Sequence, residues 1–239
     1  MKNSMKYDVN RATTVDYVIY SVHSFSNHND YYLVFDSDTI PLHPIPYFST
    51  DGRPNFITKI EYNKPYFDTI DRLFDGKVGR VNPAESFIAE NMMIDKKLMI
   101  EMLDVIMANS KIKGDTFYEK ALNAVNRDYV RYTGFSEFET FGNYVMTFHP
   151  QEYGKVKIRT QRLGAFLLGD EPNEEQLKWA SNDYDIISIE PFGRRWLGKK
   201  TKQNSVREKY SAKELFDKYI KMSNLLDRIM LKRVIKYDE

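Results

Sequence analysis

The feature that most constrains the fold is the segment YYLVFDSDTIPL, residues 31–42, where an apolar and aromatic run ends at two aspartates. Residues 31–35 are rich in β-formers and predict a buried strand. Residues i and i+2 of a strand point to the same side, so Asp36 and Asp38 are expected to direct both carboxylates to one point. Because ligands of open α/β sheets bind at the carboxyl ends of strands, this strand end is a candidate site.

Helical and extended patterns alternate along the rest of the chain, and the alternation predicts an α/β domain. We expect a helix from about Lys96 after a strand in SFIAENMM, and a helix in GDTFYEKALNAVN with Asp115 as its N-cap. RLGAFLLGD is interpreted as a strand and turn, and NEEQLKWASNDYDIISIEPF as a helix, a turn and a strand. Further helices are expected over residues 11–25 and 66–74, the latter after an extended piece in FITKI.

Composition excludes several classes of protein. The chain is 42% hydrophobic and 14% aromatic, which is typical of a globular domain. It has no cysteine, which excludes disulfides, thiolate zinc sites and cysteine nucleophiles and fits a reducing cytoplasm. No apolar run of about 18 residues is present, and MKNSMKYDVNRATT lacks the apolar core of a signal peptide, so we expect a cytoplasmic protein.

Charge divides the chain into a mildly acidic body, residues 1–193, and a basic tail, residues 194–239. The tail holds 14 Lys and Arg against 6 Asp and Glu. We interpret it as a basic linker, residues 194–206, followed by an amphipathic helix with one apolar stripe. Such a helix can pack on the domain, lie on an anionic membrane surface or bind nucleic acid. The signatures of nucleic-acid binding are missing, so we expect packing, with weak attraction to the inner face of the membrane as a secondary effect.

The two aspartates suit a hard divalent cation. Mg²⁺ takes one or two carboxylates together with substrate phosphates, so Asp36 and Asp38 could hold a metal against a diphosphate. The metal would neutralise charge that develops on a phosphate leaving group. The alternative is that Asp36 begins a turn and Asp38 caps it, which is the commoner role of an isolated Asp-x-Asp. The preceding strand favours the metal interpretation.

A second acidic pair lies in GFSEFETFG, where Glu137 and Glu139 stand among aromatic residues. Glycosyl transfer with inversion needs a carboxylate base, and burial among aromatics would raise the pKa of a glutamate. Ser136 and Glu139 also match a capping box, in which Glu139 reaches back to the helix start. Glu137 and Glu139 are both candidate catalytic residues, and Glu137 is the preferred one. Glu90 and Asn91 stand at a strand end and could bind sugar hydroxyls, although Asn91 could equally cap a turn.

These segments together resemble a known family. YYLVFDSDTIPL resembles the metal-binding motif of nucleotide-sugar glycosyltransferases with the GT-A fold. SFIAENMMIDKKLM and FSEFETFGNYV resemble blocks of a bacterial family of GT-A-like glycosyltransferases, and the likeness covers roughly residues 11–190. It implies a GT-A-like mixed sheet flanked by helices. It also implies transfer of a sugar from a nucleotide-sugar donor to a glycan or lipid-linked acceptor, in polysaccharide biosynthesis.

The resemblance also implies roles for single residues. Asp38 would bind Mn²⁺ or Mg²⁺ directly, while Asp36 would contact the metal through water, or contact the sugar or ribose. His149, in TFHP, would be a third metal ligand, since some GT-A enzymes use a late histidine. The alternative, an ordinary surface or hydrogen-bonded histidine, is favoured.

The chain departs from the family pattern at its start. A GT-A domain usually places a nucleotide-binding βαβ portion before the motif, but only 35 residues precede Asp36. We therefore expect an N-terminally shortened domain over residues 1–193, completed by another chain or by an oligomer if it is active. The alternative function is a non-catalytic truncated module that binds a partner chain or a glycan.

Overall fold

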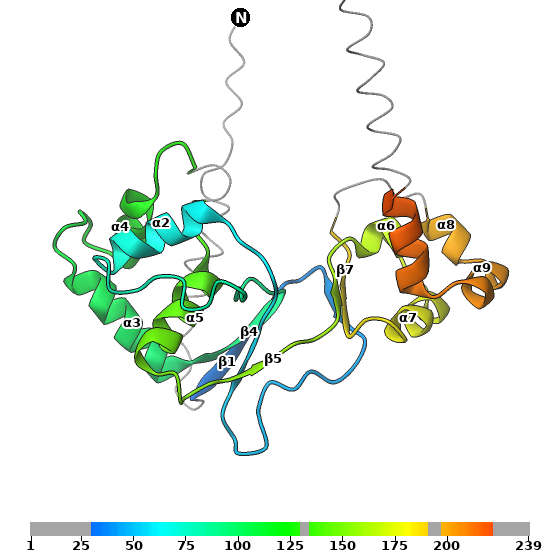
Figure 1. Cartoon of the computed structure of the whole chain (residues 1–239), viewed down its shortest axis with the longest axis horizontal. Helices are drawn as coiled ribbons and strands as arrows, with labels where there is room; N and C mark the ends of the chain where they lie inside the picture. The colour runs from blue at the N-terminus through cyan, green and yellow to red at the C-terminus, as the bar shows by residue number, and fades with distance from the viewer. Residues whose placement is uncertain (1–29, 130–133, 191–196, 222–239) are drawn as a thin grey trace, which may run out of the picture. The chain divides into compact units, whose positions relative to one another are not determined.

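The computed structural model describes residues 30–129, 134–190 and 197–221, which form a mixed α/β structure with small sheets (Figure 1). The chain divides into two compact units. The first comprises residues 1–36 and 46–157, and the second comprises residues 37–45 and 158–239. The predicted helix over residues 11–25 and the predicted domain boundary at residue 193 lie outside the described residues.

The first unit contains two pairs of strands. Strand β1 (Tyr31–Phe35) pairs antiparallel with β4 (Asn91–Asp95), and β3 (Asn55–Ile57) pairs parallel with β5 (Gly154–Val156). The register of the first pair sets Phe35 opposite Asn91. Its helices, labelled in Figure 1, are α2 (Lys64–Leu73), α3 (Lys96–Ala108), α4 (Phe117–Ala124) and α5 (Glu137–Phe148).

Aromatic and aliphatic side chains from these elements form one core. Phe56 of β3 stacks on Tyr153 with ring centroids 4.0 Å apart and meets Phe87 edge-on at 5.0 Å. A Cβ atom at Gly142 of α5 would lie 2.3 Å from Phe87 Cγ, so glycine is what lets the ring pack against the helix. The fully buried core residues of this unit include Ile70, Leu73, Ile94, Met99, Met102, Ile106, Phe141 and Tyr144.

The second unit has a three-stranded sheet and its own core. Strand β7 (Ile186–Ser188) pairs antiparallel with β2 (Thr39–Pro41) and parallel with β6 (Thr160–Gln161). Trp179 is mostly buried, and its indole Nε1 donates to the Tyr210 carbonyl at 2.9 Å. The helices are α6 (Gly164–Leu168), α7 (Glu174–Ser181), α8 (Gly198–Thr201), α9 (Asn204–Lys209) and one covering residues 212–221.

Several local predictions need correction. RLGAFLLGD is not a strand, because residues 164–168 form the short buried helix α6. The N-cap of α4 is Thr116, one residue after the predicted Asp115, because Thr116 and Glu119 form a reciprocal capping box. The predicted linker is ordered over residues 197–206, where α8 begins directly after the buried Leu197.

The structure also bears on the predicted single sheet and on the predicted apolar stripe of the C-terminal helix. The strands of the described ranges form three small sheets instead of one mixed sheet. The predicted apolar stripe of the C-terminal helix is supported by Ala212 and Leu215, which are buried in the second core, and the stripe beyond residue 221 lies outside the described residues. Among the helices that the structure describes, none is both long and apolar enough to cross a lipid bilayer.

Candidate functional site

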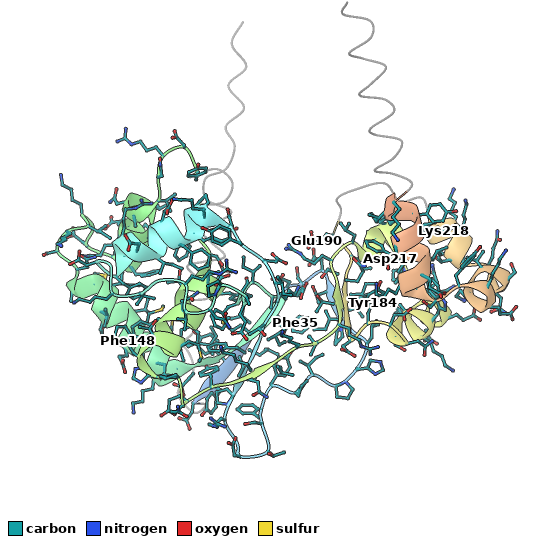
Figure 2. The ribbon with its side chains drawn as sticks, in the orientation of Figure 1. Phe35, Phe148, Tyr184, Glu190, Asp217 and Lys218 are labelled. Carbon is teal, nitrogen blue, oxygen red and sulfur yellow. The ribbon has the colours of Figure 1, made fainter. Side chains whose placement is uncertain are left out.

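The two aspartates follow the end of β1 but are not part of a strand. Strand β1 ends at Phe35, which is labelled in Figure 2, and Ser37 and Asp38 form a turn before β2 begins. The side-to-side alternation of a strand therefore does not apply to Asp36 and Asp38, and that part of the prediction is wrong. Both residues are exposed. Asp36 is the last residue of this stretch of the first unit, and Asp38 belongs to the second.

Strand pairing brings Asp36 close to two other predicted residues. Because β1 and β4 are antiparallel, the carboxyl end of β1 lies beside the amino end of β4. The Asp36 amide donates to the Glu90 carbonyl at 2.9 Å, and Asn91 is the first residue of β4. The structure thus places Asp36, Glu90 and Asn91 at one edge, although Glu90 and Asn91 stand at the start of β4 and not, as predicted, at the end of a strand.

A fourth residue of this edge, Lys59, was not predicted. Lys59 follows β3 and forms two backbone hydrogen bonds with Ser86, at 3.0 and 2.9 Å. Its ammonium group forms an ion pair with Glu90 Oε1. The only sequence signal was a lysine two residues past a strand, which is too common to single out. Asp36, Lys59, Glu90 and Asn91 are called the edge cluster below.

Three polar atoms of the edge cluster are buried without a partner. Glu90 is 2% exposed and Asn91 is 1% exposed. Glu90 Oε2, Asn91 Oδ1 and Asn91 Nδ2 have no hydrogen-bond partner among the described residues. More than about 90% of buried polar atoms in folded proteins have a partner, and leaving one unpaired costs about 1–3 kcal/mol. The edge cluster therefore keeps hydrogen-bonding capacity that is typical of a binding site.

Glu139 is linked to the edge cluster through Ser86, whose backbone pairs with Lys59. The Ser136 hydroxyl caps α5 by accepting from the Glu139 amide at 3.3 Å, so one half of the predicted capping box is present. The Glu139 carboxylate, however, accepts from Ser86 Oγ at 2.5 Å and from Asn143 Nδ2 at 2.8 Å. It is 1% exposed, and burial raises its pKa against the opposing effect of these hydrogen bonds.

These contacts favour an anchoring role for Glu139 over the predicted catalytic one. Ser86, which it holds, is the residue that pairs with Lys59. Asn143 also accepts from the Val81 amide at 3.0 Å, so α5 fixes both ends of the segment 81–86. Glu137 is half-buried in the first turn of α5. Residues i and i+2 of a helix do not share a face, so the contacts of Glu139 do not bear on Glu137, whose catalytic role stays a prediction.

His149 lies at the opposite end of α5, after Phe148, which is labelled in Figure 2. Its Nε2 is 2.6 Å from Glu101 Oε1, which also accepts from the Tyr144 hydroxyl at 2.7 Å. Hydrogen bonds from Tyr144 and His149 lower the pKa of Glu101. These contacts fit the alternative of an ordinary hydrogen-bonded histidine. Within the described ranges, no group of three or more His, Asp or Glu side chains is arranged to hold a metal ion.

No protein-family model matches the chain, and no curated protein is significantly similar to it in sequence.

Proposed function

We propose that the chain is a GT-A-like glycosyltransferase. It would move a sugar from a nucleotide-sugar donor to a hydroxyl of a glycan or lipid-linked acceptor, with Mn²⁺ or Mg²⁺ as cofactor. The observation that carries the proposal is the edge cluster, in which Asp36 follows β1 beside the buried, unpaired atoms of Glu90 and Asn91. Asp36 follows the carboxyl end of β1, while Glu90 and Asn91 stand at the amino end of β4, and the antiparallel pairing brings the two ends together.

The acidic motif suits a cation that arrives with its substrate. Asp36 and Asp38 are exposed and separated by one residue, so covalent geometry keeps their Cα atoms within about 7 Å. Mg²⁺ commonly takes one or two carboxylates and completes its shell with water and substrate phosphates. When bound, the metal would neutralise the charge of the departing diphosphate.

The remaining roles fall to protein side chains. Glu90 and Asn91 would hold hydroxyls of the transferred sugar and orient the ring. In an inverting transfer, Glu137 would take the proton of the acceptor hydroxyl. The acceptor oxygen would then bond to the anomeric carbon as the bond from that carbon to the phosphate oxygen breaks. Glu139 would keep Ser86, and through it Lys59, in place.

Thermal unfolding with ligands tests the proposal. Mn²⁺ together with a nucleoside diphosphate, taken from a panel of uridine, guanosine, cytidine and adenosine forms, should raise the Tm more than Mn²⁺ alone. A ligand present at 100 times its Kd stabilises by about 2.7 kcal/mol. Asp38→Ala should abolish the increment, whereas Asp104→Ala, at an exposed position of α3, should keep it. An equal increment in Asp38→Ala would refute the metal assignment, and silence across the panel would favour the non-catalytic module.

A further inference from the structure

We propose that Glu90 and Asn91, with Lys59 held against them, bind two neighbouring hydroxyl groups of an uncharged sugar ring. This inference rests on the proposed function, because it names the class of sugar that the site would take. It is carried by the chemistry and burial of the unpaired atoms, and it adds Lys59 to the residues that determine specificity.

The unpaired atoms match the hydrogen-bonding pattern of a diol. Glu90 Oε2 and Asn91 Oδ1 are acceptors, and Asn91 Nδ2 is a donor. A hydroxyl group donates one hydrogen bond and accepts others, so two hydroxyls on neighbouring carbons can satisfy all three atoms. A phosphate or carboxylate group offers acceptors only, and it would leave both protein acceptors unpaired.

The charges of the edge cluster also favour an uncharged ring. The ammonium group of Lys59 is paired with Glu90 Oε1, and the two side chains are only 12% and 3% exposed. Lys59 therefore neutralises Glu90 without offering a free positive charge to the ligand. A uronic acid would place its carboxylate beside Glu90 Oε2, an acceptor that a carboxylate cannot satisfy, and Lys59 would have no free charge to offer it.

Backbone hydrogen bonds fix the main-chain positions of Glu90, Asn91 and Lys59 before any ligand arrives. Asn91 is opposite Phe35 in the β1–β4 ladder, and the Glu90 carbonyl accepts from the Asp36 amide. The Lys59 backbone is fixed by its two hydrogen bonds with Ser86. Little ordering is then required on binding, which is the condition for discriminating between sugars with few contacts.

A matched pair of substitutions separates a binding role from a structural one. Asn91 and Asn143 are both 1% exposed, but Asn143 donates to the Glu139 carbonyl and carboxylate and accepts from Val81. Asn143→Leu should lower the Tm by several degrees, because it breaks these bonds. Asn91→Leu removes only unpaired atoms and should leave the Tm unchanged or raise it. If Asn91→Leu lowers the Tm as much as Asn143→Leu, the Asn91 amide is structural and the inference fails.

Ligand-observed NMR of the full chain measures the binding itself. D-glucose, D-galactose and D-mannose, at about 10 mM, test for Kd values in the millimolar range, and D-glucuronate and D-galacturonate are the charged counterparts. At least one neutral hexose should give saturation transfer, its uronate should give none, and Asn91→Leu should reduce the signal at least about tenfold, as expected when a buried polar contact is lost. Equal signals from hexose and uronate, a signal unchanged in Asn91→Leu, or no signal from any hexose would overturn the inference.

The two proposals fail in different ways. A Tm increment with Mn²⁺ and nucleotide that depends on Asp38, without hexose binding, supports the transferase and refutes the diol site. Hexose binding that depends on Asn91, without any nucleotide response, supports the diol site and refutes the transferase.

Discussion

Glu139→Ala tests whether a buried carboxylate holds the segment that precedes the edge cluster. The Glu139 side chain is 1% exposed and accepts from Ser86 Oγ and Asn143 Nδ2. Truncation would leave both donors buried without this acceptor, at about 1–3 kcal/mol each. Removing the carboxylate also removes the free-energy cost of burying it, which offsets part of this loss. We expect the free energy of unfolding of the first unit to fall by about 2–5 kcal/mol.

Glu139→Gln is the matched variant. A glutamine carbonyl can accept from Asn143, and its amide can donate to the Ser86 hydroxyl, which rotates to accept. We therefore expect a loss below about 1 kcal/mol at pH 7. Burial raises the pKa of Glu139 above its ordinary value of 4.5, so the folded state holds this proton more tightly than the unfolded state. The contribution of Glu139 to stability then falls as pH rises above that value. The free energy of unfolding of Glu139→Gln should therefore improve relative to that of the parent as pH rises.

Urea unfolding provides the assay and an internal control. Far-UV circular dichroism follows both units, whereas the sequence has tryptophan only at positions 179 and 196, so fluorescence follows the second unit through Trp179. Variants at Glu139 should shift the circular dichroism transition more than the fluorescence transition. A Glu139→Gln variant as unstable as Glu139→Ala would show that the charge itself is required. An unperturbed Glu139→Ala would show that the carboxylate anchors nothing.

Two further predictions concern the second unit. The side-chain hydrogen bond from Arg159 lowers the pKa of Asp185, so this stabilisation is present above its ordinary pKa of 3.8 and is lost as pH falls. Because Arg159 is 51% exposed, Asp185→Asn should cost only about 0.5–1 kcal/mol at pH 7, and the difference from the parent should vanish in acid, as followed by fluorescence in urea. If exposed lysines of the second unit attract anionic membranes, changing three of them to glutamine should weaken binding to phosphatidylserine vesicles about 100-fold at low salt. A control variant with three Lys→Gln changes in the first unit should bind the vesicles as tightly as the parent. The test variant changes Lys199, Lys200 and Lys202, and the control changes Lys77, Lys97 and Lys113.

Local elements were predictable where apolar residues recur with a clear period or a cap marks an end. Strand β1 covers the run YYLVF, and α3 begins at Lys96, where the helical spacing begins. Helix α6 was missed because five consecutive buried residues have no period that separates a helix from a strand. The division into three sheets was missed because pairing is not local: Thr39 of β2 lies opposite Ser188 of β7, far along the chain.

The same limit applies to the edge cluster. Asp36, Glu90 and Asn91 were found as single residues because each follows or begins a strand-like segment. Lys59 was not found, because its importance comes from a contact with Glu90 across a gap of 31 residues. The Ser136 and Glu139 pattern was a valid capping signal, but a carboxylate has two oxygens and takes the best donors available. Here these donors include Ser86, from a segment 53 residues away.

Hydrogen-bond satisfaction decides which polar residues are candidates for function, and it cannot be read from residue type. Asn91 and Asn143 have the same side chain and the same 1% exposure. Asn143 is satisfied because Glu139 lies one turn earlier on α5 and Val81 approaches from the loop. Asn91 stands where β1 ends and β4 begins, and its side-chain amide has no hydrogen-bond partner among the described residues. The sequence alone does not distinguish the two asparagines. The opposite effects on Tm that we expect of Asn91→Leu and Asn143→Leu follow only from the way the surrounding segments pack.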